Sequence, residues 1–231
     1  MEFFSGYSTK ADGSMYLSVD GFDPENEINR KRYFDSIGCR DLPVVSAGLV
    51  HGTSVSDVRS GIPSHFKETD ALVTDKPGVI LTLTGADCFP VYFEDRLSNI
   101  VGIAHAGWRG IVHGIIPQTI DRLVSLGSKP ERLNMHIGPG ICADHFEIRR
   151  DILPFFSTFH TAVREETSPV EKVTVDLKRI ILRQAATAGI SANRISESTE
   201  CTCCLQEKYF SYRRDRPETI QAQVAYIGMR Q

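Results

Sequence analysis

The chain has 231 residues, with 26 Lys and Arg against 29 Asp and Glu and a formal net charge of −3. Hydrophobic residues make up 41% and charged residues 24% of the chain, a balance typical of globular proteins. Near-neutral charge argues against a nucleic-acid partner, and no apolar stretch approaches the roughly 20 residues that span a bilayer. We therefore expect neither a nucleic-acid partner nor a membrane partner.

The organisation of the chain is simple. We find no internal repeat, no low-complexity segment and no long linker, so we expect a single domain over residues 1–231. The first residues lack the basic and apolar regions of a signal peptide, which predicts a cytoplasmic protein. The six cysteines are then expected to be reduced, as buried thiols, metal ligands or nucleophiles rather than disulfide partners.

The N-terminal half is expected to hold one helix and several strands. Alternating apolar and polar residues predict a strand at 14–19. Pro24, the spacing of Ile28, Arg32 and Ile37, and the following Gly38 predict a helix over 24–37.

Three short apolar runs then predict buried strands, and the last two are close enough to form a hairpin. These runs cover residues 78–83, 90–93 and 99–104.

The pattern changes to helical spacing after Gly110. An apolar stripe runs from Ile111 to Val124, which predicts an amphipathic helix that ends at Gly127 and is interrupted only by Pro117. Further along the chain, Asp176 is expected to cap a helix that ends at Gly189. Strands are predicted at 133–137, 208–213 and 222–227.

Because strands outnumber helices and some are joined as hairpins, we expect an α+β fold with a mixed β-sheet rather than a doubly wound parallel sheet.

Polar side chains with metal-binding chemistry follow three of the apolar runs. His51, Cys88 and His105 each stand at the end of such a run, with small residues beside them. Two imidazoles and one thiolate suit a catalytic zinc site, which has three protein ligands and one open position. Zinc held in this way can activate a bound water at neutral pH. Spacing alone leaves the alternative open that each histidine is a hydrogen-bonded core residue.

The remaining histidines have no such context, and we expect ordinary structural roles for them (His65, His113, His136, His145 and His160). Cys201 and Cys204 have CxxC spacing, which could serve metal binding or redox chemistry. No second CxxC and no nearby His completes a four-ligand set in the sequence. We therefore expect Cys201, Cys203 and Cys204 to be structural.

Five motifs carry a resemblance to a known family. They are VHG at 50–52, ADC at 86–88, HAGWRG at 105–110, IGPGI at 137–141 and FSYRRD at 210–215. In this combination the chain resembles the YfiH family, first described as multicopper polyphenol oxidases with a laccase domain and now described as purine nucleoside phosphorylases with adenosine deaminase activity. The resemblance runs over nearly the whole chain.

The resemblance implies a fold, a metal and a reaction. It implies a mixed β-sandwich with flanking helices, of the kind also grouped with cysteine hydrolases. The zinc ligands of the family fall on His51, Cys88 and His105, the residues that also end the apolar runs. The expected cofactor is zinc, with copper as the alternative, and the expected partners are purine nucleosides and phosphate.

Phosphorolysis needs cations that hold phosphate, and deamination needs an acid that moves a proton. Arg109, Lys10 and Arg213 are the candidates for the phosphate, together with a helix that begins after Gly110. Asp87, beside Cys88, is the candidate acid, although neighbouring strand residues point to opposite faces and it could instead anchor the turn. Relatives commonly have arginine where this chain has Lys10, so the two-pronged guanidinium contact is lost there.

Several alternatives stay open at this point. Cys88 could be a covalent nucleophile with His105 as its base, although we favour the ligand role. The chain could also be a copper-dependent phenol oxidase, an amidase that edits peptidoglycan precursors, or a binding module in which metal only stabilises the fold. Copper oxidases use many histidines, commonly in HxH pairs, and this sequence has seven histidines and no HxH pair.

Overall fold

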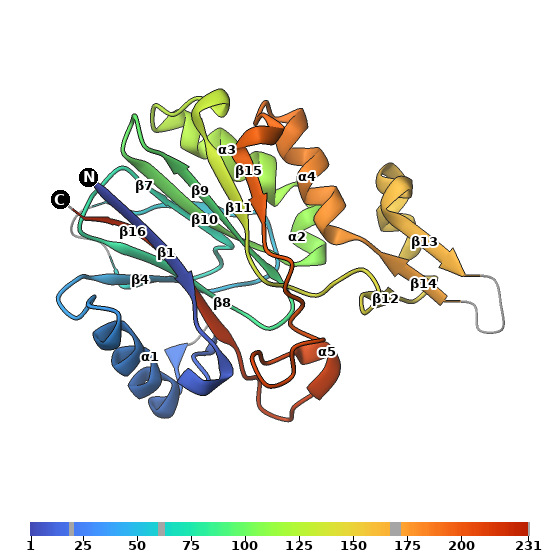
Figure 1. Cartoon of the computed structure of the whole chain (residues 1–231), viewed down its shortest axis with the longest axis horizontal. Helices are drawn as coiled ribbons and strands as arrows, with labels where there is room; N and C mark the ends of the chain where they lie inside the picture. Colours follow the sequence, from blue (N-terminus) through green and yellow to red (C-terminus); the bar gives the residue numbers. More distant parts are fainter. Residues whose placement is uncertain (19–20, 60–62, 167–171, 231) are drawn as a thin grey trace.

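The computed structural model describes residues 1–18, 21–59, 63–166 and 172–230. Two β-sheets pack face to face, and helices cover their outer faces, so the layers run helix, sheet, sheet, helices (Figure 1). This arrangement confirms the expected α+β fold, a mixed β-sandwich with flanking helices. Within the described residues, every helix is too short or too polar to cross a bilayer.

Each of the two large sheets contains parallel and antiparallel pairs. The five-stranded sheet has the order β1 (Glu2–Tyr7), β16 (Gln223–Arg230), β8 (Ile80–Gly85), β4 (Val44–Ala47), β6 (His65–Phe66). The six-stranded sheet has the order β15 (Ile195–Glu197), β11 (Asn134–Ile137), β9 (Phe89–Asp95), β10 (Ile100–Ala106), β7 (Ala71–Thr74), β5 (Val55–Asp57). The predicted hairpin is confirmed as β9 and β10, which pair antiparallel from Ile100 opposite Asp95 to Ala106 opposite Phe89.

Strand β10 shows why the central strands are apolar without interruption. Val101 and Ile103 point into the space between the two sheets, whereas Ile100 and Ala104 belong to the core beneath the helices. Successive side chains of a strand point to opposite faces, so a strand buried on both faces carries apolar residues at every position.

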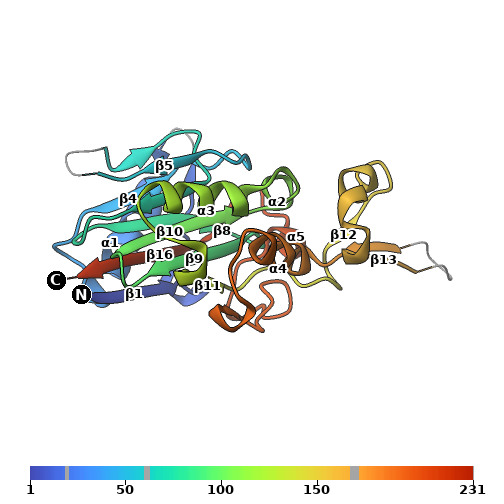
Figure 2. The same ribbon diagram turned by 90° about the horizontal axis from the view of Figure 1, so that it is seen from above.

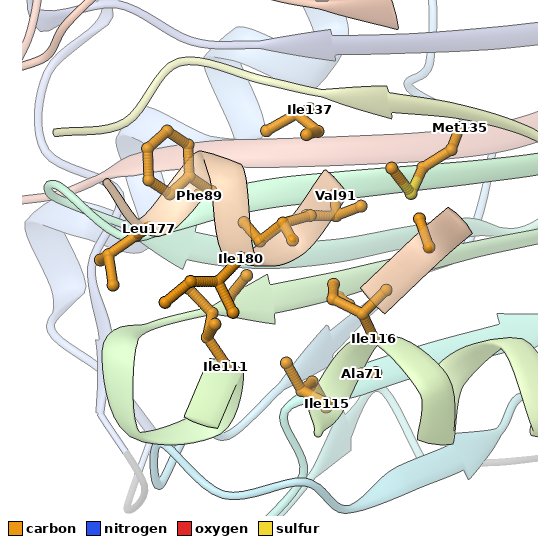
Figure 3. Close-up of a cluster of buried hydrophobic side chains, with 14 of the residues drawn as sticks. Ala71, Phe89, Val91, Ile111, Ile115, Ile116, Met135, Ile137, Leu177 and Ile180 are labelled. Atoms are coloured by element: carbon orange, nitrogen blue, oxygen red, sulfur yellow. The ribbon is translucent and has the colours of Figure 1, made fainter. Parts of the chain in front are cut away.

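Helices on the two outer faces complete the layers. The six-stranded sheet is covered by α2 (Trp108–His113), α3 (Ile115–Ser125) and α4 (Leu177–Thr187), whose isoleucines and leucines pack on β9 and β11 (Figure 3). The five-stranded sheet is covered by α1 (Pro24–Ser36). Asp176 caps α4 as predicted, since its Oδ1 accepts the N–H of Arg179 at 3.1 Å.

The remaining elements are short. They are α5 (Tyr212–Asp215), the 3-10 helices η1 (Lys10–Asp12), η2 (Pro130–Arg132), η3 (Leu153–Ala162) and η4 (Ala192–Arg194), and the strands β2 (Leu17–Ser18), β3 (Gly21–Phe22), β12 (Glu147–Ile148), β13 (Val163–Glu166) and β14 (Lys172–Val175). The last three form a small sheet of order β12-β14-β13, which projects with η3 from one end of the sandwich (Figures 1 and 2).

Two expected elements differ in the structure. The helix predicted after Gly110 is two helices, and the break falls at Gly114 (φ 92°), not at Pro117. Pro117 sits in the first turn of α3, where a backbone N–H has no partner within the helix, so the proline costs little there. The strand predicted at 208–213 is wrong, because Ser211 caps α5 by accepting the N–H of Arg214.

Another expected strand is shorter than predicted. The strand predicted at 14–19 covers only Leu17–Ser18, and residues 19–20 lie outside the described part of the chain.

The helix α1 is confirmed, but most of the residues that it buries are polar. Ile28, whose spacing helped to predict the helix, is 64% exposed, whereas Arg30 is buried. The Arg30 guanidinium donates to the hydroxyls of Ser46 and Thr82, both at 2.9 Å. Phe34 is the large apolar side chain that α1 places against the sheet. The hydrogen bonds of Arg30 and the packing of Phe34 and Tyr33 therefore hold this helix against the sheet.

We predict that truncation lowers the stability of the protein much more on the buried face of α1 than on its exposed face. Phe34→Ala should lower the free energy of unfolding by about 3–5 kcal/mol, because it leaves a cavity under the helix. Ile28→Ala should change it by no more than about 0.5 kcal/mol, because that side chain already contacts water. Urea unfolding of both variants measures this, and a larger loss for Ile28→Ala would mean that α1 buries its other face.

Candidate metal centre

Three segments that are distant in sequence bring His51, Cys88 and His105 together. His51 follows β4, Cys88 lies in the turn between β8 and β9, and His105 lies near the end of β10. Their ligand atoms all lie within 4.8 Å of one another. The Cys88 Sγ is 4.0 Å from His51 Nε2, and the two imidazole rings meet edge to face at 4.8 Å between centroids. These three residues form what we call the triad.

A buried carboxylate that the sequence analysis missed supports the triad. Asp70 is 0% exposed, and its Oδ1 lies 3.0 Å from His105 Nδ1. Its two oxygens also accept the backbone N–H groups of His51 at 2.9 Å and of Gly52 at 2.7 Å. A carboxylate on Nδ1 fixes the imidazole so that Nε2 faces a metal. The only local signal was an acidic residue directly before the apolar run of β7.

The backbone around the triad is tightly constrained. His51 has φ 60°, a left-handed conformation that is unfavourable for a residue with a side chain. The Asp70 carboxylate holds this conformation through its bonds to two consecutive N–H groups. At Gly107 a Cβ would lie 2.9 Å from His51 Cδ2 and 3.0 Å from Cys88 Sγ. Glycine at this position therefore lets the main chain pass directly beside the triad.

The residues of the triad shift one another's pKa values so that the charged forms of Cys88 and His105 are favoured. Burial raises the pKa of the Cys88 thiol, but the charges and hydrogen bonds of His105 and His51 outweigh burial and lower it to about 6. Burial lowers the pKa of His105, whereas Cys88 and Asp70 raise it to about 9. Without metal, the site therefore holds a thiolate beside an imidazolium at neutral pH.

The donor set fits zinc. Tetrahedral zinc has sulfur at about 2.3 Å and imidazole nitrogen at about 2.0 Å, so neighbouring donor atoms lie roughly 3.5 Å apart. The 4.0 Å between Cys88 Sγ and His51 Nε2 needs only a small closure to reach that separation. Three protein ligands leave a fourth position open, as in catalytic zinc sites.

Asp87 has both carboxylate oxygens engaged. Oδ1 accepts the hydroxyl of Thr202 and Oδ2 accepts the backbone N–H of Arg213, each at 2.7 Å. Asp87 itself has φ 90° and is only 8% exposed. These contacts tie the turn that carries Cys88 to the C-terminal segment, which is the anchoring role that the sequence left open.

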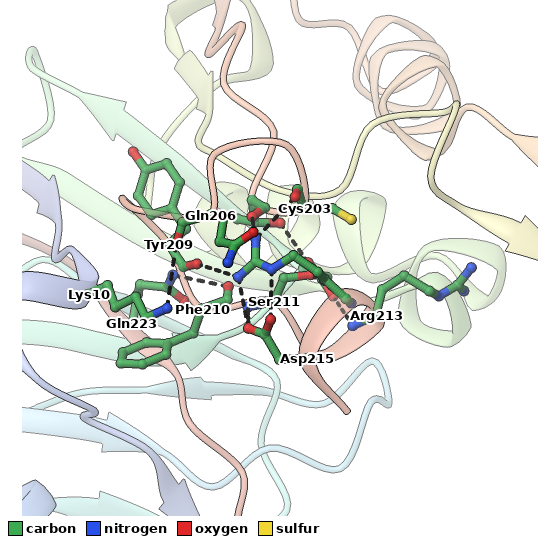
Figure 4. A network of polar contacts seen from close by, with 12 residues as sticks. Lys10, Cys203, Gln206, Tyr209, Phe210, Ser211, Arg213, Asp215 and Gln223 are labelled. Atoms are coloured by element: carbon green, nitrogen blue, oxygen red, sulfur yellow. Dashed lines mark hydrogen bonds and ion pairs between the residues drawn. The ribbon is translucent and has the colours of Figure 1, made fainter. Parts of the chain in front are cut away.

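The side chains of the three candidate phosphate-binding cations contact different neighbours in the structure. Arg109 is exposed in the first turn of α2, which begins at Trp108 and not after Gly110, and its guanidinium lies 4.4 Å from the Trp108 ring centroid. Lys10 approaches the Phe210 ring, and Arg213 extends away from Lys10 (Figure 4). The Arg213 guanidinium donates to two backbone carbonyls.

The expectation that no histidine lies near the Cys201 to Cys204 segment is wrong. The structure places Cys142 and His145 beside Cys201 and Cys204, and the four ligand atoms lie within 4.8 Å of one another. The partners are about 60 positions apart in sequence, so spacing could not reveal them. Cys203 is not part of this group.

Comparison with known proteins shows the family of the chain. The model of the family described as multi-copper polyphenol oxidoreductase laccase matches residues 4–230. A purine nucleoside phosphorylase of Deinococcus radiodurans is 33% identical over 191 residues, covering 83% of this chain and 72% of that protein. An adenosine deaminase, RL5, from an unknown prokaryotic organism is 32% identical over 148 residues, covering 63% of this chain and 56% of that protein.

Among solved structures, the crystal structure of a hypothetical YfiH protein from Bacillus licheniformis superposes with a TM-score of 0.90 at 29% identity. The superposition covers 99% of this chain and 93% of the other. The family match over almost the full length, the sequence identity and the shared fold together show that the chain belongs to the YfiH family.

Proposed function

We propose that the protein is a zinc-dependent purine nucleoside phosphorylase that also deaminates adenosine. The observation that carries this proposal is the triad of His51, Cys88 and His105 with the Asp70 carboxylate behind it. Relatives named for these two activities support the choice of reactions.

The triad residues would hold the metal, and the rest of the site would hold the triad. When bound, zinc would supply a Lewis acid and an open coordination position for a water or a substrate atom. Asp70 keeps the Nδ1 proton of His105 in place, which leaves Nε2 free as a ligand. Asp87 acts as a positioning residue for Cys88, because both of its oxygens already accept hydrogen bonds.

In phosphorolysis a phosphate oxygen bonds to C1′ of the ribose while the bond from C1′ to the purine nitrogen breaks. The departing base takes up a proton, and ribose 1-phosphate is the second product. Arg109 is our first candidate cation for phosphate, because it lies four residues beyond His105 and its exposed guanidinium rests on the Trp108 ring. The Arg213 guanidinium already donates hydrogen bonds to the carbonyls of His145 and Glu147.

Deamination needs water in place of phosphate. Water adds at C6 of adenine, and ammonia leaves, so adenosine becomes inosine without a phosphate requirement. The same purine-binding site and the same bound metal would then serve both reactions, while the anion-binding residues would serve only the first.

The first prediction of this proposal concerns phosphate. Zinc-loaded protein should release hypoxanthine and ribose 1-phosphate from inosine only when phosphate is present. The same protein should convert adenosine to inosine with or without phosphate. Liquid chromatography of the products measures both reactions, and oxygen consumption with phenols by copper-loaded protein tests the copper oxidase alternative in parallel. Phenol oxidation without turnover of any nucleoside would contradict the proposal.

The second prediction separates the two reactions by one side chain. Arg109→Ala should lower kcat/KM for phosphorolysis by about 10- to 100-fold through a weaker hold on phosphate, corresponding to the loss of a charge-assisted hydrogen bond. Deamination should change much less, because it uses no phosphate. Arg40→Ala is the matched control, since Arg40 is an exposed arginine just beyond α1 on the opposite side of the sandwich.

Equal losses of both reactions in Arg109→Ala, with the zinc content unchanged, would show that Arg109 does not bind the phosphate.

The third prediction concerns the charge of Cys88. In metal-free protein, alkylation of Cys88 by iodoacetamide should rise through about pH 6 and level off above it, because the thiolate reacts and its pKa is depressed. His105→Gln should move this midpoint to higher pH by removing the imidazolium. Peptide mass spectrometry resolves each cysteine, and Cys203, whose pKa is raised chiefly by burial, serves as the internal reference.

Added zinc should suppress the labelling of Cys88 if the thiolate is a ligand. Full activity in metal-free protein, with inactivation that follows the labelling of Cys88, would instead make Cys88 a nucleophile.

A further inference from the structure

A second cluster of metal-binding side chains lies outside the triad. It consists of Cys142, His145, Cys201 and Cys204, which we call the four-ligand cluster. Cys142 and His145 lie between β11 and β12, and Cys201 and Cys204 lie between β15 and α5. From its geometry we propose that the four-ligand cluster binds one structural zinc ion. This site is separate from the triad and does not depend on the proposed reactions.

The distances within the four-ligand cluster suit tetrahedral zinc. The His145 Nδ1 lies 3.2 Å from Cys142 Sγ, 3.4 Å from Cys204 Sγ and 3.9 Å from Cys201 Sγ, and the sulfurs of Cys142 and Cys204 are 4.0 Å apart. Zinc at about 2.3 Å from sulfur and about 2.0 Å from nitrogen places two sulfurs roughly 3.8 Å apart and sulfur and nitrogen roughly 3.5 Å apart. These four distances are close to those of a zinc tetrahedron, and the other two sulfur pairs lie within 4.8 Å.

The sequence spacing supports the same assignment. Cys142 and His145 form a CxxH pair and Cys201 and Cys204 a CxxC pair, so each pair can hold the ion from one short turn. Three thiolates and one imidazole fill four positions and leave none open, which is the arrangement of structural zinc rather than catalytic zinc. Cys204 and His145 are exposed, so an ion can enter from solvent.

The main chain already supports the ligands. The Cys142 N–H donates to Cys201 Sγ at 3.2 Å, a contact that stabilises a thiolate ligand. Gly140 and Cys201 are joined by an isolated β-bridge, which aligns the two segments.

A disulfide bond would account for fewer of the four side chains than a zinc ion does. All six cysteines are free thiols in the structure, and the sulfurs of Cys142 and Cys204 are 4.0 Å apart, about twice the length of an S–S bond. One disulfide would also leave His145 and the third cysteine without a partner.

The four-ligand cluster connects to the triad through residues between and beside its ligands. Thr202, between Cys201 and Cys204, donates to the carboxylate of Asp87, which precedes Cys88. The carbonyl of His145 accepts from Arg213, whose backbone N–H donates to Asp87 as well. Zinc in the four-ligand cluster would therefore fix the turn that presents Cys88 to the triad.

Zinc content of the full chain tests the proposal. Protein that is chelated, reloaded with zinc and desalted should hold about two zinc ions per chain. Cys204→Ser should lower this to about one, and so should His51→Ala, which affects only the triad. The double variant should hold none. Cys203→Ser is the matched control in the same segment and should keep about two.

Cobalt(II) provides a readout that does not require a variant of the four-ligand cluster to fold. His51→Ala loaded with cobalt should show tetrahedral absorption with strong thiolate-to-metal charge-transfer bands, because three thiolates remain in the intact cluster. One zinc per chain in the parent protein and none in His51→Ala would overturn the proposal. A disulfide between two cluster cysteines, found by mass spectrometry of protein purified without reductant and unable to take up a second zinc, would overturn it too.

Discussion

The hydrogen bonds of one buried carboxylate hold the candidate metal centre together. Asp70 is fully removed from water, and a carboxylate in such a place is stable only when several donors satisfy it. The donors it finds are the backbone N–H groups of His51 and Gly52 and the Nδ1 of His105. The same bonds hold the left-handed conformation of His51 and the tautomer of His105. Two of the three triad residues thus take their geometry from a residue that would not touch the metal.

The sandwich supplies the rigid frame that this arrangement needs. Residues of β8, β9 and β10 are buried almost without exception, so the ends of these strands are fixed by packing on both faces. Cys88 and His105 stand at two of these ends, and the loop after β4 brings in His51. Asp87 then links the Cys88 turn to Thr202 and Arg213 near the C-terminal end. A change in that distant segment can therefore reach the triad through one carboxylate.

The family is described as a multicopper laccase, but this chain lacks the histidine pairs that are common in multicopper oxidases. The family model is described as a laccase, yet the triad has three ligands and the sequence contains no HxH pair. Two imidazoles and one thiolate occur both in catalytic zinc sites and in electron-transfer copper sites, so only the missing histidine pairs, which would hold further copper ions, argue against a multicopper oxidase. The relatives named as purine nucleoside phosphorylase and adenosine deaminase carry names of reactions that transfer no electrons.

The sequence alone determined what short-range patterns encode: the buried strands, the β9–β10 hairpin and the Asp176 cap of α4. It also marked His51, Cys88 and His105 as candidate metal ligands, which the structure brings together. Only the tertiary structure decided which segments meet. It brought Asp70 behind His105, set Cys142 and His145 beside Cys201 and Cys204, and buried Arg30 rather than Ile28 under α1. The physical reason is that periodicity and caps depend on neighbours a few residues apart. Contacts between segments tens of residues apart depend on how the packed sheets align, and no local pattern records that alignment.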